Sequence, residues 1–84
     1  MVSATIVFKT PDDVANFVRK VSKYDIDVDI KKGTALLDGK SLEGLYALQL
    51  NTELTCIVHE NMENATKIIE DINEFTKSSF AECK

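Results

Sequence analysis

The stretch DIDVDIK, residues 25–31, alternates acidic and aliphatic side chains without a break. In an extended chain this alternation places Ile26, Val28 and Ile30 on one face, and the three aspartates with Lys31 on the other. A β-strand with one face in a core and the other in water is the regular structure that separates these residues. The stretch therefore predicts a sheet that is covered on one side and open on the other.

Three further segments have the composition or the alternation of strands: residues 3–9, 34–37 and 52–59. The first is rich in β-branched and aromatic residues, and the last places Leu54, Cys56 and Val58 on one face. Gly33 predicts a turn between the strand at 25–31 and the short strand at 34–37. Gly39, after an aspartate, ends that short strand.

The first helix has a clear start signal in the sequence Thr10-Pro11-Asp12-Asp13. Thr10 suits the N-cap, proline suits the first helical position, and the two carboxylates suit the positive end of the helix. The residues that follow form one apolar stripe at helical spacing: Val14, Phe17, Val18 and Val21. We therefore expect an amphipathic helix that begins after Thr10.

Two more helices are expected downstream. Ser41 is a preferred N-cap residue, and it precedes a short apolar segment in which Gly44 costs about 1 kcal/mol relative to alanine. That helix should be short and should depend on packing. A longer amphipathic helix is predicted from about Met62 to Thr76 by its apolar residues, Ala65, Ile68, Ile69, Ile72 and Phe75.

The predicted order is strand, helix, strand, strand, helix, strand, helix. A half-polar sheet with apolar helical stripes implies an α+β fold, an open-faced two-layer sandwich with three helices on one face of an antiparallel four-stranded sheet. The 84 residues are enough for one domain, residues 1–84, in which 77–84 form a polar, frayed tail.

Charge and hydropathy narrow the function. Fourteen acidic residues against 10 basic ones give a net charge of −4, and nucleic-acid binding requires a concentrated basic surface. No apolar run approaches the ~20 residues that cross a bilayer, and the N-terminus lacks the basic region of a signal peptide. We expect no nucleic-acid partner, no membrane insertion and a cytoplasmic location.

The two cysteines do not indicate a metal or redox site. Cys56 lies in an apolar segment and should behave as a small buried hydrophobic residue, whereas Cys83 lies near the end of the polar tail. Neither has the CxxC or Cys-His spacing of zinc sites and redox dithiols, although a disulfide between the two remains open. No metal and no cofactor are therefore expected.

The segment Lys40-Ser41-Leu42-Glu43-Gly44-Leu45-Tyr46-Ala47-Leu48, together with the order of elements, resembles HPr. HPr is the histidine phosphocarrier of the phosphoenolpyruvate-dependent sugar phosphotransferase system, and the resemblance covers most of residues 12–59. It implies a protein partner from that system or its regulation. It also implies that Ser41 is a candidate for regulatory phosphorylation and that Leu42 and Leu45 are candidate partner-binding residues.

The resemblance fails at the phosphocarrier site. Aligned without a gap, the position of the family phosphohistidine falls on Thr10 and that of the active-site arginine falls on Asp12. Thr10 has no nucleophilic ring nitrogen, and Asp12 would repel a phosphoryl group. The resemblance therefore implies a divergent member without the active-site histidine, a regulatory or protein-binding module rather than an enzyme, similar to the catabolite-repression paralogue.

Three alternatives stay open at this point. Ser41 is a helix cap, and it is either also a switch or nothing more, since Glu43 places a carboxylate near it. His59, the single histidine, is an alternative phosphoacceptor at the end of a strand. A small-molecule-binding α+β domain unrelated to sugar transport is the third alternative, because such pockets leave no short motif.

Overall fold

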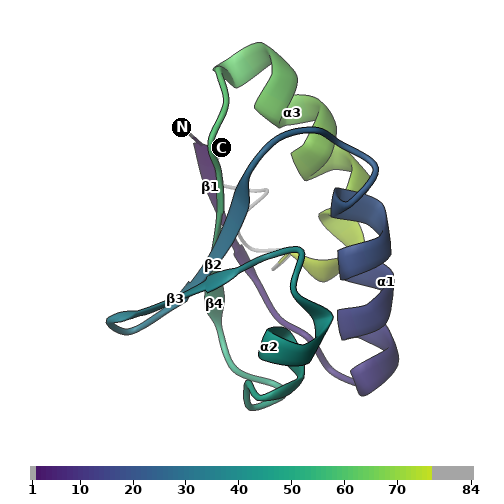
Figure 1. The fold of residues 1–84 in the computed structure, drawn as a ribbon, viewed down its shortest axis with the longest axis vertical. Helices are drawn as coiled ribbons and strands as arrows, with labels where there is room; N and C mark the ends of the chain where they lie inside the picture. The colour runs from purple at the N-terminus through teal and green to yellow at the C-terminus, as the bar shows by residue number, and fades with distance from the viewer. Residues whose placement is uncertain (1, 77–84) are drawn as a thin grey trace.

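In the computed structural model, which describes residues 2–76, strands and helices follow one another in the predicted order (Figure 1). The elements are β1 (Val2–Ile6), α1 (Pro11–Val21), β2 (Val28–Lys32), β3 (Ala35–Asp38), α2 (Leu42–Tyr46), β4 (Leu54–Val58), α3 (Met62–Asp71) and a 3₁₀ turn, η1 (Asn73–Phe75). The predicted polar tail and Cys83 lie outside the described residues. Within residues 2–76, no helix is both long enough and apolar enough to span a bilayer.

The four strands form one antiparallel sheet in the order β1-β4-β2-β3. The helices lie on one side of this sheet, as Figure 1 shows, and the other side is open. The predicted open-faced two-layer α+β sandwich is therefore confirmed. The β2–β3 turn is also where the sequence places it, since Gly33 has a φ of 61°, a left-handed conformation that glycine adopts without steric cost.

The core lies between the sheet and the helices. Every second residue of β4 is fully buried, and the stripes of α1 and α3 pack on the same cluster. Its main members are Ile6, Val14, Phe17, Val21, Val28, Ile30, Leu54, Cys56, Val58, Ala65 and Ile68. The opposite face of the sheet carries Ser3, Thr55 and Lys31, so the alternation in the sequence does separate core from solvent.

Two strands are shorter than the sequence suggests. β1 ends at Ile6, and the amide of Val7 donates to the carbonyl of Phe75 (2.9 Å), so the chain leaves the sheet to meet η1. β2 starts only at Val28, because the preceding residues complete the turn that follows α1. Asp27 nevertheless accepts a backbone hydrogen bond from His59 (3.0 Å), which extends the sheet contact by one residue.

The sequence predicts a continuous last helix as far as Thr76, and the structure shows that this prediction is wrong. α3 ends at Asp71, Ile72 leaves the helical conformation (φ −106°, ψ 17°), and the 3₁₀ turn η1 follows. The ammonium group of Lys20 on α1 donates to the free carbonyl of Asp71 (3.2 Å), which satisfies one of the last acceptors of the helix. The tighter turn directs Phe75 into the core, where it is 4 % exposed.

The ends of α1 and α3 are joined by a polar cluster around Asp71. The Tyr24 hydroxyl donates to the Asp71 carboxylate (2.9 Å), and the Lys23 ammonium lies 3.2 Å from it. The hydrogen bond from Tyr24, followed by that from Lys23, lowers the pKa of Asp71. The same hydrogen bond to Asp71, with burial, raises the pKa of Tyr24. Both shifts favour the state in which Tyr24 is protonated and Asp71 is ionised.

This cluster should make stability depend on pH in a defined way. A carboxyl group whose pKa is lowered on folding stabilises the fold at pH values above its ordinary pKa, which is 3.8 for Asp71. This contribution is lost as the pH falls through the pKa of the folded state. We expect wild-type protein to lose more stability than Tyr24→Phe between about pH 7 and about pH 3. Urea midpoints of both proteins at the two pH values test this. Equal losses would show that the Tyr24–Asp71 hydrogen bond does not contribute to the pH dependence of stability.

Candidate functional site

The start of α1 is closed by its own side chains. Thr10 has extended backbone angles (φ −138°, ψ 162°), and its hydroxyl accepts a hydrogen bond from the Asp13 amide (3.2 Å). The Asp13 carboxylate in turn accepts from the Lys9 amide (2.9 Å). The prediction that Thr10 caps the first helix is confirmed. Because Pro11 has no amide hydrogen, Asp12 is the one residue of the first turn whose N–H these bonds leave unused.

The electrostatics of this helix end disfavour an added anion. A helix N-terminus attracts negative charge through its free amides, but two carboxylates, Asp12 and Asp13, already occupy the first turn. Arg19, the only arginine in the sequence, lies near the other end of α1, where it donates to Asn16 (2.9 Å). The start of α1 therefore has no guanidinium group to hold a phosphoryl group.

The cap can be tested by substitution. Thr10→Ala should lower the free energy of unfolding by about 1 kcal/mol, because the Asp13 amide loses its side-chain acceptor and keeps only the Thr10 carbonyl (3.0 Å). Thr10→Ser retains the hydroxyl and should remain close to wild type. Urea unfolding followed by circular dichroism measures both, and an unchanged midpoint for Thr10→Ala would show that the Thr10 hydroxyl does not stabilise the start of α1.

Ser41 starts α2 in the same way. Its backbone is extended (φ −96°, ψ 98°), and its hydroxyl accepts from the Gly44 amide (3.2 Å). Its own amide donates to the Asp38 carbonyl (3.1 Å), which ties the start of α2 to the end of β3. A Cβ atom added at Gly44 would lie 3.2 Å from the Ser41 oxygen, so glycine leaves room around this hydroxyl. The prediction that Ser41 is an N-cap is confirmed.

The apolar residues of α2 divide between core and surface. Leu42 is 38 % exposed and Tyr46 50 % exposed, whereas Leu45 is fully buried in the core. The prediction that Leu45 offers its side chain to a partner is therefore wrong, because this side chain is buried and packs α2 onto the core. Tyr46, which was not among the predicted partner-binding residues, shares a helix face with Leu42 because the two are four positions apart.

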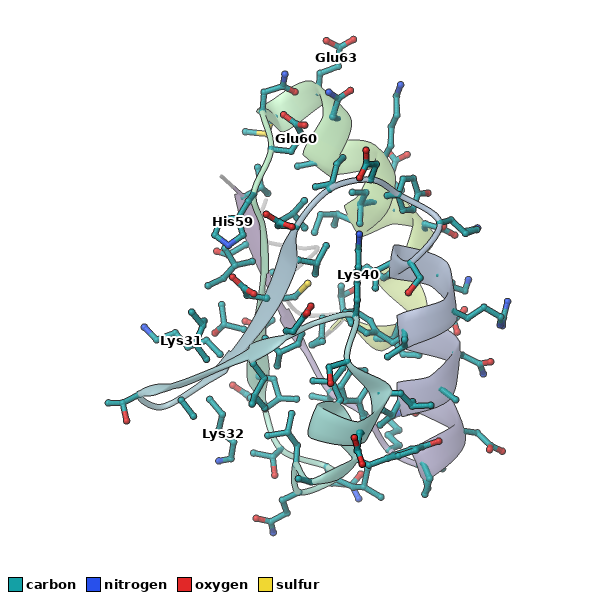
Figure 2. The ribbon with its side chains drawn as sticks, viewed as in Figure 1. Lys31, Lys32, Lys40, His59, Glu60 and Glu63 are labelled. Atoms are coloured by element: carbon teal, nitrogen blue, oxygen red, sulfur yellow. The ribbon has the colours of Figure 1, made fainter. Side chains whose placement is uncertain are left out.

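Lys40, which precedes Ser41, is directed away from α2. Its ammonium group donates to the Tyr24 carbonyl (2.6 Å), so its side chain extends toward the loop after α1, as Figure 2 shows. At the other end of α2, the Asn51 amide donates to the Phe8 carbonyl (2.7 Å). These two bonds connect the segments on either side of α2 to the segments on either side of α1. The two hydrogen bonds therefore fix the position of α2 relative to α1.

His59 lies at the end of β4, on the open side of the sheet (Figure 2). Its Nε2 atom is 2.7 Å from the Asp29 carboxylate on β2. The sequence pattern does not predict this pairing, although His59 and Asp29 both occupy outward-facing positions of the sheet. Asp27 and Asp38 line the same shallow depression. These carboxylates, in addition to Asp29, disfavour the transfer of a negatively charged phosphoryl group to the ring.

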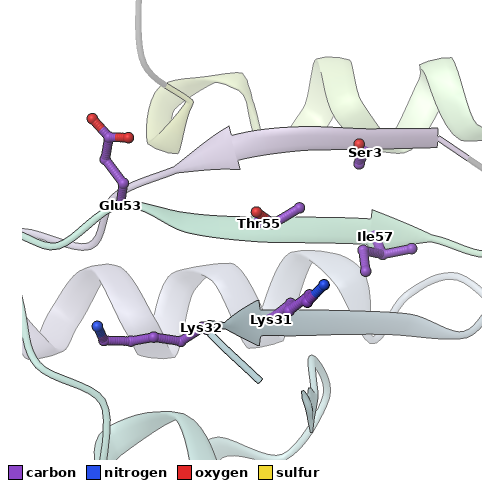
Figure 3. A pocket seen from close by; sticks show the side chains of 7 residues that line it. Ser3, Lys31, Lys32, Glu53, Thr55 and Ile57 are labelled. Atoms are coloured by element: carbon purple, nitrogen blue, oxygen red, sulfur yellow. The ribbon is translucent and has the colours of Figure 1, made fainter. Parts of the chain in front are cut away.

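The open face of the sheet also contains a shallow hollow of about 510 Å³. Figure 3 shows Ser3, Thr55 and Ile57 along its floor, with Lys31 and Lys32 on the neighbouring strand. Apart from Ile57, these side chains are polar, and the hollow that they line is open to solvent. The hollow lacks the enclosing apolar walls of a small-molecule site.

Cys56 behaves as the sequence predicted, as a buried hydrophobic residue. It is fully buried in β4, and desolvation raises the pKa of its thiol to about 12, with a smaller contribution from the charge of Asp29. Such a thiol is neither a nucleophile nor a metal ligand at neutral pH. Among residues 2–76, no three histidine, cysteine or acidic side chains are grouped as metal ligands would be.

Sequence comparisons do not identify relatives of the chain. No protein-family model matches it, and no curated protein does. The order of strands and the packing of three helices on one face of the sheet do find counterparts among solved structures.

The crystal structure of HPr-C-His from Thermoanaerobacter tengcongensis superimposes with a TM-score of 0.75 at 19 % identity, over 96 % of this chain and 97 % of that one. The chain has the fold of HPr. The phosphocarrier HPr of Bacillus anthracis matches this HPr fold with a TM-score of 0.70 at 18 % identity, over 90 % of this chain and 96 % of that one. The catabolite-repression protein Crh of Bacillus subtilis matches with a TM-score of 0.62 at 24 % identity, over 86 % and 87 %. The structure of Crh is described as an intertwined, domain-swapped dimer.

Proposed function

We propose that the chain is a protein-binding member of the HPr family in the cytoplasm that does not carry a phosphoryl group at the start of α1. The observation that supports this most directly is the closed cap at Thr10. The helix end that would hold a phosphorylated side chain is occupied by a threonine hydroxyl and by the carboxylates of Asp12 and Asp13. In this proposal Thr10 stands where the family has its phosphohistidine, and Asp12 stands where it has its arginine.

The proposal is tested with the pathway's own donor. Purified protein is incubated with phosphoenolpyruvate and the first enzyme of the phosphotransferase system, and an ordinary HPr serves as the positive control. Intact-mass spectrometry should show one added phosphoryl group on the control and none on this protein. Phosphate on Thr10 would overturn the proposal outright.

Phosphate on His59 would instead establish the alternative, a carrier with a displaced acceptor. The hydrogen bond between His59 and Asp29 favours this alternative, because a carboxylate can orient an imidazole for nucleophilic attack. The negative charges of Asp27, Asp29 and Asp38 around the His59 ring disfavour the transfer of a phosphoryl group to it. The substitution His59→Gln, assayed in parallel, assigns any acid-labile phosphate to this ring.

We further propose that partners of the phosphotransferase system or of its regulation contact the exposed face of α2. Leu42 and Tyr46 supply apolar area there, and the half-buried Ser41 lies at the start of the same helix. A phosphate on Ser41 would add about two negative charges beside Glu43 and would change the charge that a partner meets. Binding could then be switched without unfolding α2.

The serine control has its own experiment. Incubation with an HPr kinase and ATP, followed by peptide mass spectrometry, should place phosphate on Ser41 of wild-type protein and none on Ser41→Ala. If the wild-type protein stays unmodified under conditions that modify HPr, the proposed regulation by phosphorylation of Ser41 is contradicted. Binding by Leu42 and Tyr46 would then be tested separately.

A further inference from the structure

β3 is an edge strand whose outer side is free in the described part of the chain. It pairs with β2 alone, and the β2–β3 hairpin projects away from the helices (Figure 1). The Gly39 amide donates to the Val28 carbonyl (2.7 Å). Because hydrogen-bonded and non-hydrogen-bonded pairs alternate along an antiparallel ladder, the amide and carbonyl of Leu36 then point away from β2. These are the groups with which a further strand would pair.

The side chains along this edge combine an exposed apolar residue with an unusual charge pair. Leu36 is 59 % exposed on the open side of the sheet. Asp38 lies directly opposite Asp29 in the β2–β3 register, in a pair of the non-hydrogen-bonded type. Side chains approach most closely in such pairs, and like charges there are destabilising. The register thus places two carboxylates opposite each other next to the open edge.

Two more acidic groups and one histidine complete the surroundings. Asp27, Asp29, Asp38 and His59 line a groove of about 430 Å³, together with Leu36. The His59 ring is hydrogen-bonded to Asp29. The Asp38 carboxylate also lines the groove, and one oxygen of Asp38 accepts a hydrogen bond from the Lys40 amide (2.9 Å). Toward the middle of the edge, Leu36 lies opposite Lys31 of β2. The edge is therefore acidic at its Asp38 end and apolar at its centre.

We propose that the free edge of β3 binds an extended basic segment of a partner protein by antiparallel strand addition. The partner residue opposite Leu36 exchanges backbone hydrogen bonds with it and lays an apolar side chain on it. The residue two positions earlier in the partner falls opposite Asp38, because antiparallel strands run in opposite directions and side chains alternate with a period of two. A lysine or arginine there neutralises the repulsion between Asp29 and Asp38.

The chemistry of the ligand is thus a three-residue signature, basic–any–apolar, in an extended chain. This surface is distinct from the proposed partner face of α2, and its test does not depend on phosphotransfer. Strand addition draws affinity from the main chain and specificity from alternate side chains. A segment with an acidic residue in the first position should be rejected, because it would add a third carboxylate to the pair.

The test uses a fluorescein-labelled octapeptide, TTRTVTTG, and the same peptide with glutamate in place of arginine. We expect the first to bind wild-type protein and to shift the amide resonances of Leu36 and Asp38 in ¹⁵N spectra, and the second not to bind. Asp38→Asn should weaken binding about fivefold, as expected for the loss of an exposed ion pair. It should also raise the thermal midpoint of the free protein, since the repulsion with Asp29 is removed.

The matched control is Glu63→Gln, which removes one negative charge from the first turn of α3, far from β3 in Figure 2. It should leave both the peptide affinity and the Leu36 shifts unchanged. Equal weakening by Glu63→Gln and Asp38→Asn would reduce the effect to net charge and overturn the proposal. Peptide-induced resonance shifts that map to α2 would also overturn the proposal. Leu36 shifts that depend on protein concentration in the absence of peptide would do the same, because the edge would then bind a second copy of the chain.

Discussion

Replacing Phe17 with alanine is expected to lower the free energy of unfolding by about 3–5 kcal/mol. Phe17 is fully buried on α1 and makes edge-to-face contacts with Phe8 (centroid distance 5.2 Å) and Phe75 (5.8 Å). Phe8 and Phe75 also contact each other at 5.9 Å. Each ring comes from a different segment, so the three together join the entry to α1, α1 itself and η1.

The loss is large relative to the total stability of such a domain. At roughly 0.05–0.15 kcal/mol per residue, a chain of 84 residues is stable by about 4–13 kcal/mol. Urea unfolding monitored by circular dichroism should therefore show Phe17→Ala with a much lower midpoint or largely unfolded in buffer. Phe17→Leu fills most of the volume and should fall between wild type and Phe17→Ala.

The exposed Arg19 on the same helix offers the control. Arg19→Ala should change the free energy of unfolding by less than about 0.5 kcal/mol, because the residue lies on the surface. A Phe17→Ala variant as stable as Arg19→Ala would contradict the packing described for the aromatic cluster.

The second large effect is expected at Leu45. Leu45→Ala should destabilise the protein by about 2–5 kcal/mol, because Leu45 is the buried residue of α2 and its removal leaves a cavity. A helix of five residues has little stability of its own. Hydrogen exchange should therefore show faster exchange at Gly44 and Leu45 than in the wild type, in addition to a lower urea midpoint.

Leu42→Ala is the matched comparison, since it removes the same atoms one helical turn away on the exposed side. It should leave the free energy of unfolding within about 0.5 kcal/mol of wild type. In the proposed function, the same substitution weakens partner binding, whereas Leu45→Ala weakens it only by disturbing α2. A stable Leu45→Ala protein with unchanged hydrogen exchange would contradict the assignment of Leu45 to the core.

Helix starts and the open face of the sheet were predicted correctly because both depend on nearby residues. Thr10 and Ser41 cap helices through bonds that span three positions, so the sequence pattern contains the whole interaction. The alternation in residues 25–31 likewise separates two faces of a strand, whatever that strand pairs with. The place of the strand in the order β1-β4-β2-β3, by contrast, depends on long-range pairing.

Errors arose where a distant residue decides the outcome. The end of α3 depends on Lys20 and on the contacts of Phe75 with Phe8 and Phe17, which come from α1 and from the chain before it. The pairing of His59 with Asp29 joins residues 30 positions apart and follows from strand register. Neither contact leaves a local pattern, because each is formed only when the sheet and the helices have assembled.

By itself, the sequence determined the class of elements, the caps of α1 and α2, and the open polar face of the sheet. Tertiary structure alone decided that Leu45 belongs to the core while Leu42 faces solvent, and that Asp38 stands opposite Asp29. The physical reason is the range of the interactions. Propensity and capping act over a single turn, whereas burial and cross-strand charge depend on which segments the fold brings together.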